Sequence, residues 1–192
     1  DFISSHGHTA LHDPSNSMTY QIGNLPELSN YTKLKVICDF RTQDVEFGGQ
    51  GAPLVPVGEK FLFTEYNTLI NLGGFANITK RTTDNLIAYD ICPVNIVLNR
   101  LCNLVDLKYD NKGKLASSGK LKNNLFNDLQ SLEYYNLNPP KSLGVEWVNK
   151  FVLPLFDKFS DIPVKDLLHT FSNHIAKQIS ANIESNTNVL IT

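Results

Sequence analysis

One acidic residue follows a strand-type run at a point where it could perform chemistry. Asp90 comes directly after the apolar run 86–89 and just before Pro93, where a helix is expected to begin. Ligands of open α/β sheets bind outside the carboxyl ends of the strands, so a carboxylate there can serve as a general base or as a metal partner. Capping of the following helix is the competing interpretation, because Asp is a preferred N-cap residue.

A pair of glycines, Gly73 and Gly74, separates the two β-rich runs 68–72 and 75–79. This pattern predicts a β-hairpin. Because neither glycine has a side chain, the backbone can approach a ligand closely there, and its N–H groups can hold phosphate oxygens. A plain hairpin turn would use the same residues, so the spacing alone leaves both interpretations open.

Three histidines near the start of the chain, His6, His8 and His12, raise the hypothesis of a metal site. A strand would place two of the imidazoles on one face, and Asp13 would add an oxygen ligand. Gly7 interrupts that alternation if it forms a turn. We therefore expect no metal site, and we expect His6 to form a hydrogen bond in a cleft.

Strands and helices alternate along the chain and would position these residues. Strand-type runs occupy 2–5, 18–22, 34–38, 68–72, 75–79, 86–89 and 188–192, and helical spacing occurs at 25–34, 96–105 and 167–183. The dense glycines and prolines of 48–58 predict a loop or a crossing between domains. The order of elements predicts an α/β protein.

Composition excludes several classes of protein. Hydrophobic residues make up 42% of the 192 residues, charged residues make up 19%, and the net charge is −2. These values are typical of a globular protein without a basic surface for nucleic acid. No apolar run approaches the roughly 18 residues of a membrane span. The odd, widely spaced Cys38, Cys92 and Cys102 predict reduced thiols in a cytoplasmic protein.

Several motifs resemble, in the same order, those of the anhydro-N-acetylmuramic acid kinases. They occupy residues 5–12, 21–24, 39–44, 48–56, 71–77, 109–119 and 140–146. The resemblance covers essentially the whole chain, and the glycine-rich signature 48–56 is its most specific part.

The resemblance implies an actin-like (ribonuclease H-like) ATPase fold, whose two lobes with mixed sheets flanked by helices clamp ATP. Residues 1–60 are then expected to form part of the first lobe and 61–192 part of the second. The family's Gly-Thr-Ser-x-Asp-Gly phosphate hairpin and its Gly-Gly-Gly adenosine loop do not occur in the sequence. We therefore expect the chain to be incomplete at both ends and inactive by itself.

The implied activity is a kinase reaction of peptidoglycan recycling in the cytoplasm. Water opens the internal bridge of 1,6-anhydro-N-acetylmuramic acid, and the freed 6-hydroxyl group is phosphorylated. ATP and Mg²⁺ are the implied cofactors, and the anhydro sugar is the implied substrate. The family is commonly dimeric, so a homodimer is expected, without nucleic acid or membrane partners.

The resemblance also implies the roles of individual residues. Asp90 would be the general base that activates water. Phosphate would be bound by Gly73, Gly74 and Asn77. The substrate would be bound by His6, Arg41, Asp44, Gly49, Gln50, Gly51, Pro93 and Asn95. Arg41 and Asp44 could instead pair with each other, and that alternative stays open.

The segment 90–95 departs from the family pattern Asp-x-Gly-Pro-Gly-Asn. Cys92 and Val94 replace the two glycines. If those glycines needed positive φ or close approach of a ligand, the replacements would hinder the site. A non-catalytic sugar- or nucleotide-binding protein on the same fold is therefore the alternative function, and a metal hydrolase using the histidines is a third hypothesis.

Lys141 and Ser142 also admit two interpretations. They could contact phosphate, or Ser142 could begin the helix that runs through Trp147 and Phe151. Ser is a good N-cap residue, which favours the second interpretation.

Overall fold

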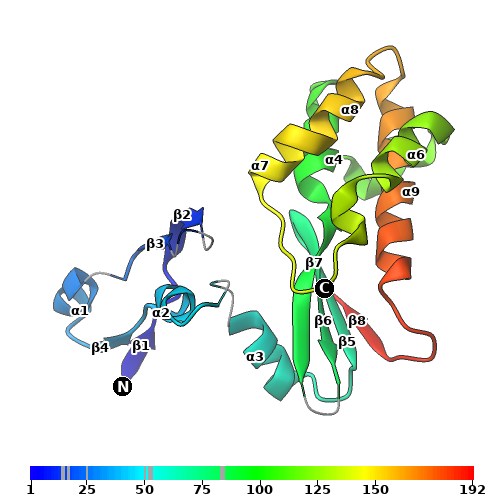
Figure 1. Ribbon diagram of the computed structural model, residues 1–192. Coiled ribbons are helices and arrows are strands. Elements are labelled where there is room, and N and C mark those ends of the chain that lie inside the picture. Colours follow the sequence, from blue (N-terminus) through cyan, green and yellow to red (C-terminus); the bar gives the residue numbers. More distant parts are fainter. Residues whose placement is uncertain (14–15, 17, 25, 50, 52–53, 83–84) are drawn as a thin grey trace. The chain divides into compact units, whose positions relative to one another are not determined.

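The structure is a computed structural model that describes residues 1–192 except 14–15, 17, 25, 50, 52–53 and 83–84. The chain divides into two compact units, Asp1–Phe63 and Thr64–Thr192. Both units contain helices and strands (Figure 1). The architecture is thus mixed α/β, as the order of elements predicts.

Small sheets and short helices make up the described part of the first unit. The sheets are a parallel pair, β1 (Phe2–Ser4) with β4 (Lys35–Ile37), and an antiparallel pair, β2 (His8–Asp13) with β3 (Met18–Ile22). The helices are α1 (Pro26–Thr32), α2 (Phe40–Glu46) and α3 (Leu54–Leu62).

The strand predicted over 2–5 is present as β1, and Phe2 at its start is 62% exposed. For the segment 48–58 the sequence predicts a loop or a crossing between domains. The loop interpretation is wrong from Leu54 onward, where α3 begins, and the crossing between domains stays a prediction. A helix can include Pro56 because the N–H groups of its first turn have no partners within the helix, so the missing N–H costs nothing.

The second unit is built on a four-stranded sheet with the order β7–β6–β5–β8. Its strands are β5 (Thr68–Leu72), β6 (Phe75–Arg81), β7 (Leu86–Pro93) and β8 (Val189–Ile191). The first three pair antiparallel, and β8 pairs in parallel with β5. The predicted hairpin around Gly73 and Gly74 is confirmed.

The strand β7 continues past the point where the sequence predicts its end. It runs to Pro93, so Asp90 lies within the strand and not at its carboxyl end. Pro93 is tolerated because β7 is an edge strand, where the absence of one backbone donor breaks no ladder.

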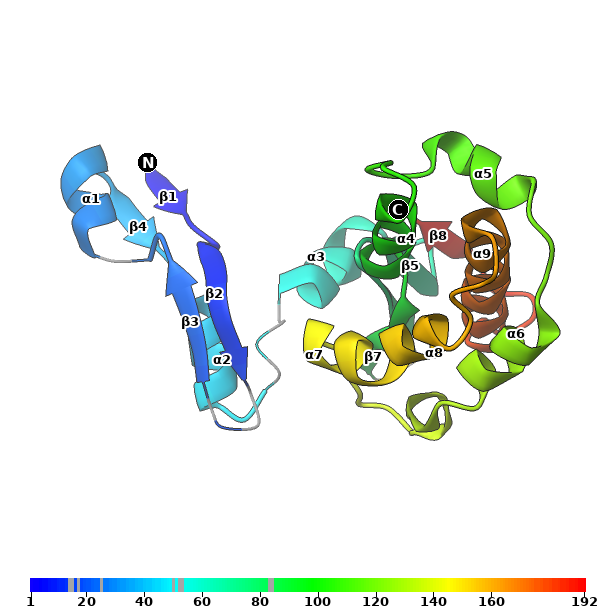
Figure 2. The ribbon, with the colours of Figure 1, turned by 90° about the horizontal axis from the view of Figure 1, so that it is seen from above.

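Helices lie between β7 and β8 in the sequence and pack together beside the sheet (Figure 2). They are α4 (Asn95–Asn103), α5 (Lys114–Ser117), α6 (Asn123–Gln130), α7 (Val145–Trp147), α8 (Leu153–Asp157) and α9 (Val164–Ala181), with a 3-10 turn at Glu133–Asn136 and a π-helical turn at Val148–Val152. The longest of them, α9, contacts α4, α5, α6 and β7.

The core of the second unit lies between this sheet and these helices. The predicted four-residue spacing on α9 buries Leu167, Phe171 and Ile175, which is the apolar stripe of an amphipathic helix. Ile179 is only partly buried, and Ile183 lies after the last helical residue, Ala181. Within the described part of the chain, no helix has both the length and the apolar character needed to cross a bilayer.

Candidate active site

Asp90 lies directly opposite Asn77 across the β6–β7 ladder. The register shifts between Ala76 and Asn77, so Ile91 is an extra residue on β7 and forms a β-bulge. Bulges change the direction in which neighbouring side chains point and are frequent beside active sites. Directly opposite residues have Cβ atoms about 5 Å apart on one face of a sheet. The fold therefore brings together two of the residues that are predicted to belong to the site.

The carboxylate of Asp90 is held at one oxygen. The backbone N–H of Leu143 donates to Oδ2 at 2.8 Å, and no hydrogen bond within the described part of the chain reaches Oδ1. Burial raises the pKa of the Asp90 carboxyl, and the Leu143 hydrogen bond opposes that change. A half-buried carboxylate with one free oxygen can accept a proton.

Helix capping, the competing interpretation of Asp90, is wrong. The N-cap of α4 is Val94, and no side chain caps that helix. The N–H groups at the start of α4 instead donate to carbonyl groups of the turn between β5 and β6. The backbone N–H of Val94 donates to the Gly74 carbonyl at 2.8 Å, and the side-chain amide of Asn95 donates to the Gly73 carbonyl at 2.8 Å.

The same turn retains one backbone donor for a ligand. The N–H of Gly73 donates to the carbonyl of Phe75 at 3.2 Å, whereas the N–H of Gly74 has no acceptor among the described residues. Gly74 is also open, since a Cβ added there would meet no atom within 4 Å. The phosphate role of these glycines stays a prediction, with Gly74 as the better placed donor.

In the first unit, Arg41 and Asp44 both bind the backbone of Gly51. The Arg41 Nε donates to the Gly51 carbonyl, and the Gly51 N–H donates to Asp44 Oδ2 at 2.7 Å. Arg41 also donates to Thr9 Oγ1 at 2.6 Å. The ion pairs of the described residues do not include one between Arg41 and Asp44. A Cβ on Gly49 would overlap the Asp44 carboxylate, so a side chain at this position would have to displace that carboxylate.

The remaining predicted residues of the first unit give less information. His6 is exposed, and its Nδ1 lies 2.9 Å from the carbonyl oxygen of Gly7. Gln50 lies outside the described residues. The described residues contain no group of three His, Cys, Asp or Glu side chains placed to hold a metal ion. The His12 side chain is also outside the described part.

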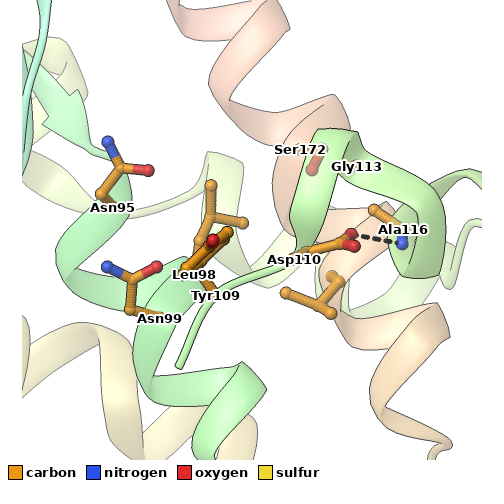
Figure 3. Close-up of a pocket in the computed structure, with 9 residues that line it drawn as sticks. Asn95, Leu98, Asn99, Tyr109, Asp110, Gly113, Ala116 and Ser172 are labelled. Atoms are coloured by element: carbon orange, nitrogen blue, oxygen red, sulfur yellow. Dashed lines mark hydrogen bonds between the residues drawn. The ribbon is translucent and has the colours of Figure 1, made fainter. Parts of the chain in front are cut away.

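A hollow of about 420 Å³ opens beside α4 and α9 (Figure 3). It is lined by Asn95, Leu98, Asn99, Tyr109, Asp110, Gly113, Ala116, Leu168 and Ser172. The Asp110 carboxylate accepts hydrogen bonds from the N–H groups of Leu115 and Ala116, both at 2.8 Å, and so fixes the start of α5. Asn95 links this hollow to the Gly73 turn.

Comparison with known proteins decides the family. The sequence model of the family described as anhydro-N-acetylmuramic acid kinase matches residues 1–190. The chain belongs to this family. The anhydro-N-acetylmuramic acid kinases of Clostridioides difficile (strain 630) and Bacillus cereus (strain G9842) are 37% and 35% identical over 199 and 196 residues. The alignments cover 96% and 95% of this chain but 52% and 48% of those relatives, so the chain spans about half the length of the curated relatives it matches.

The two departures from the pattern of anhydro-N-acetylmuramic acid kinases are buried in the core. Cys92 is fully buried and Val94 is 6% exposed. Neither residue has a positive φ, and that of Val94 is −128°. In this chain neither position uses the backbone conformation that favours glycine. The apolar packing of both side chains explains how the fold accommodates them.

Residues that the sequence did not single out complete the surroundings of Asp90. The Tyr134 hydroxyl donates to the Asp90 carbonyl oxygen at 2.6 Å, and Leu143 contributes the N–H described above. Ser142 does not begin a helix, because α7 begins at Val145 with Gly144 as its N-cap. The only signal in the sequence was the 140–146 motif shared with anhydro-N-acetylmuramic acid kinases, which names the segment but not its partner.

Proposed function

We propose that the whole protein is an ATP-dependent kinase that opens 1,6-anhydro-N-acetylmuramic acid with water and phosphorylates the freed 6-hydroxyl group. The observation that carries this proposal is the family match over residues 1–190. The site supports it with Asp90, a half-buried carboxylate that has one oxygen held and one free. This activity would serve peptidoglycan recycling in the cytoplasm.

Asp90 would act as the general base. Its free Oδ1 would accept a proton from water while the water oxygen bonds to the anomeric carbon of the sugar. The bond between that carbon and the bridging oxygen breaks, and the bridging oxygen, which stays on C6, takes the terminal phosphoryl group of ATP. Burial favours this role because a carboxylate with a raised pKa is a stronger base.

The turn at Gly73 and Gly74 would receive the phosphates. The open space and the unpaired N–H at Gly74 fit an anionic oxygen, and Asn77 lies near on the next strand. Mg²⁺ bound with ATP would neutralise negative charge on the phosphates. Asn95 and Pro93 would border the sugar at the same end of the site.

Residues of the first unit are also proposed to bind the sugar. Arg41 and Asp44 already bind the backbone of Gly51, so their proposed role is to hold Gly51 in position. Gly49, Gly51, Gln50 and His6 would then contact the sugar. We also propose that the complete enzyme has the actin-like fold, that 1–60 and 61–192 belong to its two lobes, and that it forms a homodimer.

The direct test supplies full-length protein with ATP, Mg²⁺ and 1,6-anhydro-N-acetylmuramic acid. We expect ADP and the 6-phosphate of N-acetylmuramic acid to form in equal amounts, as measured by coupled assay and mass spectrometry. N-acetylmuramic acid, which lacks the bridge, serves as the matched control substrate. The absence of any anhydro-sugar-dependent ADP release would contradict the proposal and point to the binding-protein alternative.

A further inference from the structure

We infer that Tyr134 and Lys141 are positioning residues for Asp90, and that they act by holding the segment 141–143 against the free edge of β7. This inference rests on the proposed function, in which Asp90 is the general base.

The outward-pointing backbone groups of Asp90 on β7 need hydrogen-bond partners from outside the sheet. Among the strands of the described residues β7 is the outermost in its sheet, so its backbone groups that point away from β6 have no partner strand there. The Asp90 N–H donates to the Lys141 carbonyl at 3.2 Å, and the Asp90 carbonyl accepts from the Tyr134 hydroxyl at 2.6 Å. The segment from Tyr134 to Lys141 thus satisfies both outward groups of this one residue, as a further strand would.

A third hydrogen bond from the same segment reaches the functional group itself. The N–H of Leu143 donates to Asp90 Oδ2 at 2.8 Å, two residues after the backbone contact made by Lys141. Hydrogen bonds weaken steeply as distance and angle depart from their optimum. The position of the segment therefore sets which oxygen of Asp90 is held and which remains free.

The Lys141 side chain contacts Tyr134 and so links the two ends of the segment 134–141. Its Nζ donates to the Tyr134 carbonyl at 3.1 Å and lies 4.7 Å from the centre of the Tyr134 ring. Both contacts are of the kind that stabilise an ammonium group. Lys141 is thereby engaged within the protein, which argues against a primary role as a phosphate ligand.

Aromatic packing fixes Tyr134 in turn. Its ring lies 5.3 Å from that of Trp147 and 5.8 Å from that of Tyr135, and the residue is only 5% exposed. Burial raises the pKa of the Tyr134 hydroxyl, which therefore stays protonated and can donate to Asp90. The buried Tyr134 hydroxyl donates to the Asp90 carbonyl, and this contact suits a residue whose role is to position Asp90.

The titratable groups around Asp90 among the described residues include Tyr89 and Cys92 on β7, together with Tyr134, Tyr135 and Lys141. Burial raises the pKa of the Cys92 thiol to about 12. Burial lowers the pKa of the Lys141 ammonium. The titration of Asp90 on the acid side is therefore governed by its own burial and by the Leu143 hydrogen bond, which depends on the segment.

The test uses full-length protein with Tyr134→Phe, Lys141→Met and Lys141→Arg, and with Tyr31→Phe as the control at a tyrosine that is 86% exposed. Without the hold on the segment, the Leu143 bond weakens and the pKa of Asp90 rises. A higher pKa makes the carboxylate a stronger base, but the loss of its fixed orientation is expected to outweigh that gain. We therefore expect kcat to fall roughly tenfold, as for the loss of one good hydrogen bond, with little change in the KM for the sugar. The acid limb of the kcat/KM profile moves to higher pH, and Lys141→Arg restores part of the activity.

A second measurement does not depend on turnover. The carboxyl carbon of Asp90 is titrated by ¹³C NMR in the free protein and assigned by its absence in Asp90→Asn. We expect a higher Asp90 pKa in Tyr134→Phe and in Lys141→Met than in the wild type and Tyr31→Phe. An unchanged titration in both variants overturns the inference. Failure of the wild type to phosphorylate the sugar overturns the proposed function alone, because the NMR result still decides the role of the pair.

Discussion

At the residue scale, Asp90 is subject to two opposed influences. Burial disfavours its charged form, and the Leu143 N–H favours it, with burial the larger of the two. A carboxyl group whose pKa is raised in the folded protein binds its proton more tightly there than in the unfolded chain. The residue best suited to accept a proton is therefore also one that reduces stability at neutral pH.

This leads to a prediction for Asp90→Asn. Wild-type stability attributable to this group is highest below the ordinary pKa of 3.8 and falls as the pH rises through the raised pKa of the folded state. Asp90→Asn has no carboxyl group to ionise, so it does not lose this stability as the pH rises. We therefore expect the variant to unfold at a higher temperature than the wild type at pH 7, with the difference shrinking toward pH 3. Differential scanning calorimetry across this range measures it. A variant less stable than wild type at pH 7 would show that the charged carboxylate is net stabilising.

At the scale of elements, the helix α9 carries a buried titratable group into the core. His174 is fully buried, with its Nδ1 3.0 Å from Gln130 Nε2 and its Nε2 2.9 Å from the Tyr135 hydroxyl. Because the Gln130 amide also accepts from Gln178, its nitrogen is the donor to Nδ1, and the proton of His174 lies on Nε2. Burial lowers the pKa of His174 to about 4.

Stability should therefore fall on acidification. A histidine with a depressed pKa binds protons more readily in the unfolded chain, so the destabilisation develops as the pH falls from about 6.5 toward 4. The full shift corresponds to roughly 3 kcal/mol. Urea unfolding at pH 7 and pH 4.5 measures this change. We expect His174→Gln to be less stable than the wild type at pH 7 but to show a smaller pH dependence. Equal slopes in wild type and His174→Gln would contradict the account.

The elements also show what the sequence could and could not predict. Local signals identified the hairpin at Gly73 and Gly74 and the apolar stripe of α9, because both depend on spacing within one segment. The loop interpretation of 48–58 is wrong at Pro56 because proline is tolerated in a first helical turn, whereas the alternative of a crossing between domains stays a prediction. The contact between Tyr134 and Asp90 joins residues 44 positions apart, so only tertiary packing creates it.

At the scale of the whole molecule, the proposed enzyme needs residues from both compact units. The loop 49–51 belongs to the first unit and Asp90 to the second. Gly49 lies so close to the Asp44 carboxylate that any side chain there must displace it, whereas Gly58 has no atom within 4 Å of an added Cβ. Alanine substitution of Gly49 therefore tests the proposed role of the first unit in sugar binding, and alanine substitution of Gly58 is the matched control.

We expect Gly49→Ala in full-length protein to raise the KM for the anhydro sugar roughly tenfold, since the shifted Asp44 no longer holds Gly51. The value of kcat should change less, because Asp90 is untouched. Gly58→Ala should leave the kinetics unchanged and add about 0.5 to 1 kcal/mol of stability, as expected for Ala in a helix interior. Steady-state kinetics and thermal unfolding measure both. A wild-type KM in Gly49→Ala would contradict the proposed role of Gly49 and Gly51 in binding the sugar.

The central claim is that Asp90 is the general base of a sugar kinase. The most direct measurement compares kcat/KM for anhydro-sugar phosphorylation in full-length wild type, Asp90→Asn and Asp157→Asn, with Asp157 as an exposed aspartate on α8. We predict a loss of about 10³-fold or more for Asp90→Asn with its fold intact, and wild-type activity for Asp157→Asn. Turnover by Asp90→Asn at the wild-type rate would contradict the assignment.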